Sequence, residues 1–243
     1  SRTMALVLEA LESVDFRLSE MHGGGLRNAI PREANALIVL ANKDMEVLEN
    51  ALRATANDLA AEYKTTDSGL NITWTTQDSP SHALPEDVQN ALLLAIQTCP
   101  VGIHRMSPDI VGLVQTSNNL ARIEVENGKV NIQCLNRSSV DSEKLDHTRS
   151  IEGAFTLAGL TTKRGGAYPG WTPNPSSAAV EMLRALYVER YNEDPKVMAC
   201  HAGLECGILG TNYPDMDMAS FGPNIRGAHS PDECVQISSV QKF

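Results

Sequence analysis

Two alternating runs joined by an Asn-Gly pair constrain the fold of this chain more than any other feature. Residues 112–139 read GLVQTSNNLARIEVENGKVNIQCLNRSS, with Asn127-Gly128 between the runs. Asparagine tolerates a left-handed backbone and glycine adopts it freely, so the pair is typical of a two-residue hairpin turn. The sequence therefore predicts an antiparallel hairpin near the middle of the chain.

The segments around the hairpin predict further strands and helices. Alternating or short apolar runs predict strands over residues 14–21, 35–41 and 70–76. Apolar residues at helical spacing predict helices over residues 4–13, 43–63, 85–99 and 142–159. This succession predicts an α+β domain, an antiparallel sheet with helices on one face.

The composition changes sharply at residues 161–177, TTKRGGAYPGWTPNPSS, where glycine, proline and aromatic residues predict an irregular linker. The pattern after it predicts a helix over 176–192, a strand over 196–200, a turn over 201–207 and a strand over 216–222. Such alternation is typical of an α/β sheet, whose ligands bind at the carboxyl ends of strands. We therefore predict a domain boundary near residue 161.

Charge and cysteine content exclude several classes of protein. The formal net charge of −10 argues against a nucleic-acid binder, which needs a basic surface to neutralise phosphates. No apolar run approaches the roughly 20 residues of a membrane span, and we expect no signal peptide. The five cysteines are odd in number and form no Cys-x-x-Cys pair, which is typical of reduced thiols in a cytoplasmic protein.

His229 is the strongest candidate for a chemical role. It precedes Ser230 and Pro231 in RGAHSPDE, where a rigid turn holds the imidazole in one direction. An imidazole placed after a strand can bind a metal or transfer a proton. The alternative is a neighbour of a helix cap, because Ser230 and Glu233 have the spacing of a capping box and Pro231 suits the first helical position.

Four other residues are candidates for contact with a ligand. Asn28, in the glycine-rich GGGLRNAIPRE, can donate hydrogen bonds to an oxyanion, and Arg137, at the end of a predicted strand, can bind a carboxylate. In HAGLECG, Gly203 permits close approach to the backbone and Glu205 can hold an ammonium group. Each also has a structural alternative. Asn28 would lie in a bulged edge strand, Arg137 would be a solvated surface arginine, and Gly203 and Glu205 would lie at the start of a helix.

These residues do not make a complete catalytic site. The chain has no G-x-S-x-G, no H-E-x-x-H and no phosphate-binding lysine motif. A metal centre needs three or four protein ligands, and only His229 is a convincing one. The residues alone therefore predict one ligand and no general base.

Five segments together resemble a known family: GGGLRNAIPRE, LNRSSVDS, GGAYPGWTPNPSS, HAGLECGIL and DMDMASFGPNIRGAHSPDE. They are similar, in the same order and over nearly the whole chain, to the bacterial aminoacyl-histidine dipeptidases. These are Xaa-His dipeptidases, carnosinase-like peptidases with two co-catalytic zinc ions.

The resemblance implies a fold and a division of the chain. Residues 1–161 are expected to form most of an α+β lid domain used for dimerisation. Residues 162–243 are expected to form the C-terminal part of an α/β zinc-peptidase catalytic domain. It also implies a small peptide substrate, a cytoplasmic enzyme and a homodimer, with no nucleic acid or membrane as partner.

The resemblance also implies roles for the candidates. His229 would be a ligand of one of two zinc ions, and Asn28, Arg137, Gly203 and Glu205 would bind the substrate. The other ligands and the general base are expected in an N-terminal segment that this chain lacks, so we expect a catalytically inactive part of a longer polypeptide. Two alternatives remain open: a non-catalytic dimerisation module, and an aminopeptidase acting on other small peptides.

Overall fold

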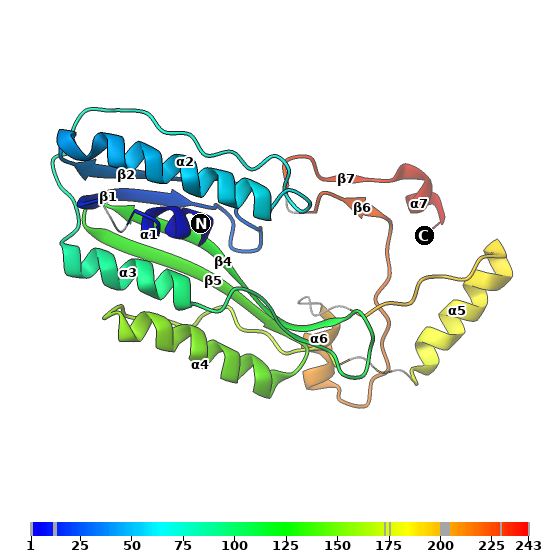
Figure 1. The fold of residues 1–243 in the computed structure, drawn as a ribbon. Helices are drawn as coiled ribbons and strands as arrows, with labels where there is room; N and C mark the ends of the chain where they lie inside the picture. Colours follow the sequence, from blue (N-terminus) through cyan, green and yellow to red (C-terminus); the bar gives the residue numbers. More distant parts are fainter. Residues whose placement is uncertain are drawn as a thin grey trace. The chain divides into compact units, whose positions relative to one another are not determined.

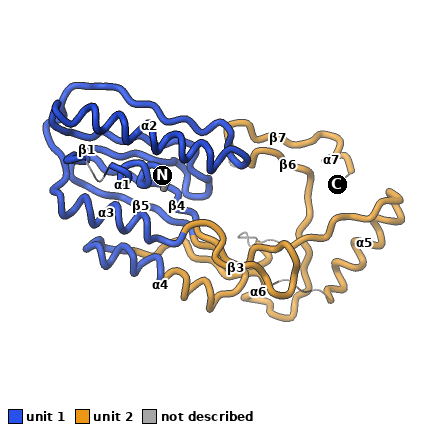
Figure 2. The backbone as a smooth tube through the Cα atoms, viewed as in Figure 1, with its two compact units in different colours: residues 1–100, 119–135, 150–162 blue, residues 101–118, 136–149, 163–243 orange. Residues whose placement is uncertain are grey.

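The computed structural model describes residues 2–11, 14–172, 174, 176–199, 205–228 and 230–242 (Figure 1). The chain divides into two compact units (Figure 2). Unit 1 comprises residues 1–100, 119–135 and 150–162, and unit 2 comprises residues 101–118, 136–149 and 163–243.

Helices and strands are interspersed along the chain. The helices are α1 (Arg2–Glu9), α2 (Met45–Glu62), α3 (Glu86–Thr98), α4 (Asp141–Leu157), α5 (Ala178–Tyr191), α6 (Glu205–Asn212) and α7 (Ile237–Lys242), and a short 3-10 turn η1 (Asn42–Asp44) precedes α2. The strands are β1 (Phe16–Gly23), β2 (Ala34–Leu40), β3 (Gly102–Met106), β4 (Val114–Glu126), β5 (Lys129–Ser138), β6 (Ile225–Arg226) and β7 (Cys234–Val235).

Unit 1 is built on antiparallel strands, as the sequence predicted. β1 pairs with β2 from Phe16↔Leu40 to Gly23↔Ala34, with a bulge between Leu18 and Glu20. The other edge of β1 pairs with the second half of β4, from Met21↔Val125 to Gly23↔Ile123. Buried residues alternate along β1 and β4 because successive side chains of a strand point to opposite faces.

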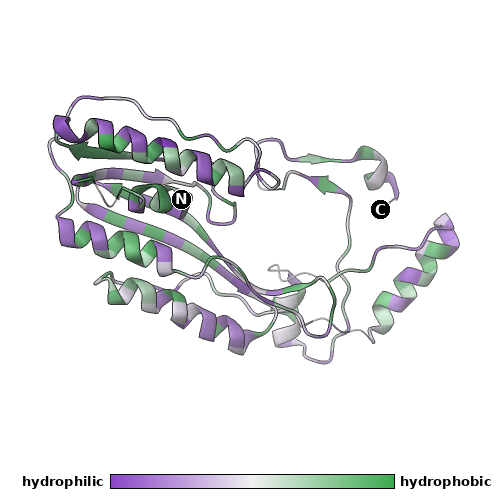
Figure 3. Cartoon of the chain, in the orientation of Figure 1, coloured by the Kyte–Doolittle hydropathy of each residue, from purple (hydrophilic) through white to green (hydrophobic). Residues whose placement is uncertain are grey.

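Helix α1 joins two other helices to these strands. α1 contacts α2, α3 and β2, and α3 also contacts β1. Figure 3 shows hydrophobic and hydrophilic residues mixed along α2 and α3, as expected for helices with one face buried. The fully buried large side chains of this core include Leu11, Leu18, Met21, Leu92 and Ile96. The predicted antiparallel sheet with helices is therefore confirmed.

The hairpin predicted at Asn127-Gly128 is also confirmed. Both residues have positive φ, 51° at Asn127 and 70° at Gly128, as a tight primed turn requires. β5 pairs with β4 across this turn.

Unit 2 includes β3, which the sequence did not predict. β3 pairs antiparallel with the first half of β4, from Gly102↔Asn118 to Met106↔Val114. All five of its residues are exposed, so it lacks the buried alternation by which strands are recognised in a sequence.

Strand predictions that lacked a neighbouring strand were wrong. Residues 70–76 form no strand, although Ile72 and Trp74 alternate in burial with exposed neighbours and Trp74 lies beneath the guanidinium of Arg53 in α2. The segment therefore rests on a helix without pairing to another backbone. The structure has no strand over residues 216–222, where one was predicted. It also has none over 196–199, the described part of the strand predicted over 196–200.

The capping box predicted at Ser230 was wrong as well. No helix begins there; Glu233 N donates to Ser230 O, and the Ser230 hydroxyl accepts from Asp232 N, so residues 230–233 form a turn that precedes β7. A turn forms here instead of a helix start because Cys234 and Val235 pair with β6.

The described residues of the C-terminal segment, residues 163–243, form no hydrophobic core of their own. Among the described residues, no buried hydrophobic side chain lies after Phe155, whereas Met198, Phe221 and Ile237 are 81%, 65% and 75% exposed. α5 nevertheless has well-formed ends, with Ser177 accepting from Val180 N and Asn192 in the left-handed region. No helix in the described part of the chain is long and apolar enough to cross a membrane.

Candidate functional site

Asn28 lies at the tip of a loop that leaves β1 in unit 1. Ala29 N donates to Leu26 O over 3.0 Å, which closes a turn with Asn28 as its third residue. Gly24 N donates to Glu33 O over 3.2 Å and closes the base of the loop. Asn28 is exposed, so its side-chain amide can donate hydrogen bonds to a ligand.

Arg137 is the penultimate residue of β5, in unit 2. On either side of it, Asn136 donates to Lys144 O and to Thr148 Oγ1 of α4, and the Ser138 and Thr116 hydroxyls share a hydrogen bond. Because side chains alternate along a strand, Arg137 points to the other face of β5. Its Nε is buried and has no hydrogen-bond partner among the described residues. A half-buried arginine whose Nε is an unpaired donor suits an anionic ligand.

Glu205 is the first residue of α6 and is exposed. Two glycines set the position of this helix within unit 2. A Cβ on Gly207 would lie 2.9 Å from Pro169 O, and a Cβ on Gly170 would lie 2.7 Å from Ser139 O. The first turn of α6 is therefore packed on residues 169–170, which are packed on the end of the strand that carries Arg137.

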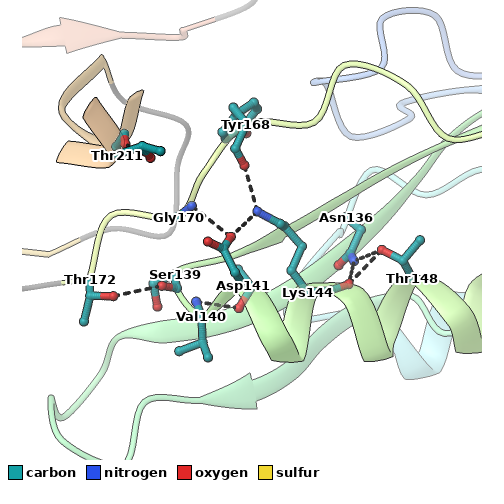
Figure 4. Close-up of polar contacts among 12 residues, drawn as sticks. Asn136, Ser139, Val140, Asp141, Lys144, Thr148, Tyr168, Gly170, Thr172 and Thr211 are labelled. Carbon is teal, nitrogen blue, oxygen red and sulfur yellow. Dashed lines mark hydrogen bonds and ion pairs between the residues drawn. The ribbon is translucent and has the colours of Figure 1, made fainter. Parts of the chain in front are cut away.

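Residues 168–172 are also held by hydrogen bonds at the start of α4 (Figure 4). Lys144 Nζ binds Asp141 and donates to Tyr168 O, Gly170 N donates to Asp141 Oδ1, and Thr172 Oγ1 donates to Ser139 O. The hydrogen bond from Lys144 lowers the pKa of Asp141, burial opposes this, and the Gly170 N–H lowers it further. Residues 168–172 of the segment predicted as a linker are thus held by specific hydrogen bonds.

A second polar cluster supports α4 from the sheet side. Glu143 accepts hydrogen bonds from Gln115, Thr116 and Arg105. Burial raises the pKa of Glu143, but these hydrogen bonds outweigh it and leave the pKa below its ordinary value. One turn further along, His147 is 2% exposed and stacks on His104 with ring centroids 4.1 Å apart. These residues could not be predicted from the sequence, because no local motif joins β3, β4 and α4.

Two of the predicted site residues, His229 and Gly203, lie outside the described residues. Within the described part of the chain, no three His, Cys, Asp or Glu residues are grouped so that they could hold a metal ion. The described residues therefore do not fit the two-zinc site that the resemblance implies. Arg137 and Glu205, in unit 2, and Asn28, in unit 1, stay predictions of residues that contact a substrate.

Comparisons with known proteins point to one class. No family model matches the chain. The chain is 37% identical, over 232 residues, to the cytosol non-specific dipeptidase of Escherichia coli (strain K12). The aligned region covers 96% of this chain and 48% of that protein. It also matches the crystal structure of the aminoacylhistidine dipeptidase from Vibrio alginolyticus, with a TM-score of 0.86 and 35% identity. That match covers 100% of this chain and 50% of that one.

The fold and these matches define the chain as dipeptidase-like. Each matched protein is named a dipeptidase, and the chain spans about half the length of each. The predicted resemblance to the bacterial aminoacyl-histidine dipeptidases is thereby confirmed for this part of those proteins. The division at residue 161 and the roles of the individual site residues stay predictions.

Proposed function

We propose that this chain supplies the substrate-binding residues of a cytoplasmic zinc dipeptidase, most specifically one that hydrolyses Xaa-His dipeptides such as β-Ala-His. The observation that carries the proposal is the buried, unpaired Nε of Arg137. Arg137 would bind the substrate carboxylate, Glu205 the ammonium group, and Asn28 the oxyanion of the tetrahedral intermediate. The backbone of Gly203 would contact the substrate, and His229 would be a ligand of one zinc ion.

Zinc would supply the activated water in the complete enzyme. Because the described residues do not form a site for two zinc ions, we assign this chain to substrate binding and expect it to be inactive alone. Two tightly bound zinc ions per isolated chain, measured by metal analysis, would contradict this assignment.

The exposed apolar residues of the C-terminal segment support a larger catalytic domain. Burial of apolar side chains stabilises a fold by about 25 cal/mol for each Å² removed from water, so a segment whose described apolar side chains are not buried has little to stabilise it. Since the matched dipeptidases are about twice as long as this chain, we propose that their remaining half covers residues 163–243.

The test is to join residues 1–243 to the part of the E. coli dipeptidase that they do not match. With zinc, the joined protein should hydrolyse β-Ala-His, and Arg137→Met should raise KM by about tenfold to a hundredfold, as expected for loss of a charge-assisted hydrogen bond. Arg149→Met, at an exposed position of α4, is the matched control and should leave KM unchanged. An unchanged KM in the Arg137 variant would exclude the carboxylate role.

Substrate range is tested on the same protein. The two relatives are named for non-specific and for aminoacylhistidine dipeptidase activity, so a panel of dipeptides with and without C-terminal histidine decides between the two. Hydrolysis of longer peptides at the same rate would favour an aminopeptidase.

We also propose that the protein forms a homodimer. The support is β3, an exposed strand whose Ile103 is 62% exposed, because such strands readily pair with a second chain. Sedimentation of a monomer at high concentration would exclude the dimer.

A further inference from the structure

We propose that Asn119 is the positioning residue for Asn28: it binds the backbone on both sides of Asn28 and holds that amide where the reaction needs it. This inference rests on the proposed function. It concerns only unit 1, which contains both the loop and this part of β4 (Figure 2).

The first step is the contact itself. Asn119 Nδ2 donates to Ala29 O over 2.8 Å and approaches Arg27 O at 3.4 Å. These are the carbonyls of the two residues that flank Asn28. The two hydrogens of the Asn119 amide nitrogen can serve both carbonyl acceptors. Among neutral side chains, only Asn and Gln have a nitrogen with two hydrogens to donate.

The second step is the support for the loop at its base. Gly24 has φ of 75°, and a Cβ there would lie 1.9 Å from Ala121 O. Ala121 is two residues along β4 from Asn119, so the loop meets the same stretch of the strand at two points. Only glycine fits at the first point, because it has no Cβ and adopts positive φ without strain.

The third step is what these contacts leave free. The turn closed by Ala29 N and Leu26 O uses backbone groups, and Asn119 uses the carbonyls of Arg27 and Ala29. The Asn28 side chain remains exposed. A donor carried on a fixed backbone needs less reorganisation to stabilise charge in the transition state, which is where a hydrogen bond contributes most to rate.

The test begins with the intact 243-residue chain and trypsin. Arg27 is exposed, and its carbonyl, which belongs to the bond that trypsin cuts, is the one that Asn119 approaches. Asn119→Asp keeps the size of the side chain and removes its donors; Asn119→Leu removes them without adding charge. Cleavage after Arg27 should become about tenfold faster in both, the factor expected for loss of one to two weak hydrogen bonds. Asn50→Asp, the same change at an exposed position of α2, should not alter it.

Cleavage after Arg53, inside α2, is measured in the same digests. Unchanged cleavage after Arg27 would overturn the proposal. Equal acceleration after Arg27 and Arg53 would also overturn it, because Asn119 would then support the whole unit rather than the loop.

The second measurement uses the joined dipeptidase described above. Asn119→Asp should lower kcat about tenfold and leave KM nearly unchanged, since the positioned amide acts on the transition state. A merely structural role would not split the two constants. Faster cleavage after Arg27 with unchanged kcat would show that Asn119 holds the loop but that Asn28 has no part in the reaction, which overturns the proposal at its functional step. An inactive parent protein, by contrast, would count against the proposed function, while the digests would still decide the role of Asn119.

Discussion

His147 offers an unusual prediction: replacing it should stabilise the protein. Its side chain is 2% exposed, and neither ring nitrogen has a hydrogen-bond partner among the described residues. An unsatisfied buried polar group costs about 1–3 kcal/mol. Stacking on His104 stabilises the folded state by about 0.5–1.5 kcal/mol and so offsets part of this cost. His147→Leu should therefore raise the free energy of unfolding by about 1 kcal/mol, or roughly 2–4 °C in Tm for a chain of this size.

The same substitution should change the pH dependence. Burial lowers the pKa of His147, and His104 lowers it further, against the opposite effects of Glu143 and Asp146. The unfolded chain binds a proton below the ordinary histidine pKa of about 6.5, and the folded chain resists it. Stability is therefore full above about pH 6.5 and falls as the pH drops towards the lowered pKa. His147→Leu should remove this part of the acid slope.

Urea unfolding followed by circular dichroism at about pH 8 and about pH 5.5 measures both effects, one on each side of the histidine pKa. His82→Leu, at an exposed position, is the control and should gain no stability. The reasoning would be refuted if His147→Leu lost about 1 kcal/mol or more at the higher pH and kept the acid slope of the parent.

Three further predictions concern glycines and the C-terminal segment. Gly207→Ala should lower the free energy of unfolding by about 1–3 kcal/mol, because the added Cβ would meet a backbone carbonyl. Gly210→Ala, in the same helix and next to a flexible methionine side chain, should raise it slightly through helix propensity. Equal effects of the two substitutions in thermal unfolding would contradict the packing argument. Gly24→Ala should destabilise strongly, because of its φ and its contact, whereas Gly25→Ala, with open space around it, should have little effect in the same assay. Residues 163–243 should make the isolated chain bind a hydrophobic dye, and joining the missing half should reduce the fluorescence; equal fluorescence would mean that the apolar side chains stay uncovered.

Local signals in the sequence predicted local structure well. The hairpin at Asn127-Gly128 followed from two residues whose backbone preferences match the turn, and α3 followed from an acidic start and an apolar stripe. The predictions over 70–76 and 216–222 failed because a strand needs a partner backbone, which is a property of the fold and not of the segment.

For the candidate site residues too, the sequence predicted local features and missed contacts between distant segments. Asn28 and Arg137 could be selected by residue type and by their place beside turns and strand ends. The contact from Asn119 to Ala29 joins residues 90 positions apart, and the packing of Gly207 on residues 169–170 joins distant segments too. No spacing rule reveals such pairs, so the groups that position the site became visible only in the folded chain.

The close fit of Gly24 against β4 has a consequence for recognising related proteins. A Cβ at this position would lie 1.9 Å from Ala121 O, so a relative that presents the same asparagine turn must have glycine four residues before the asparagine. A sequence that keeps the asparagine but has any larger residue there has rebuilt this corner of the molecule. The pair is therefore a diagnostic signature for this loop, more selective than the asparagine alone.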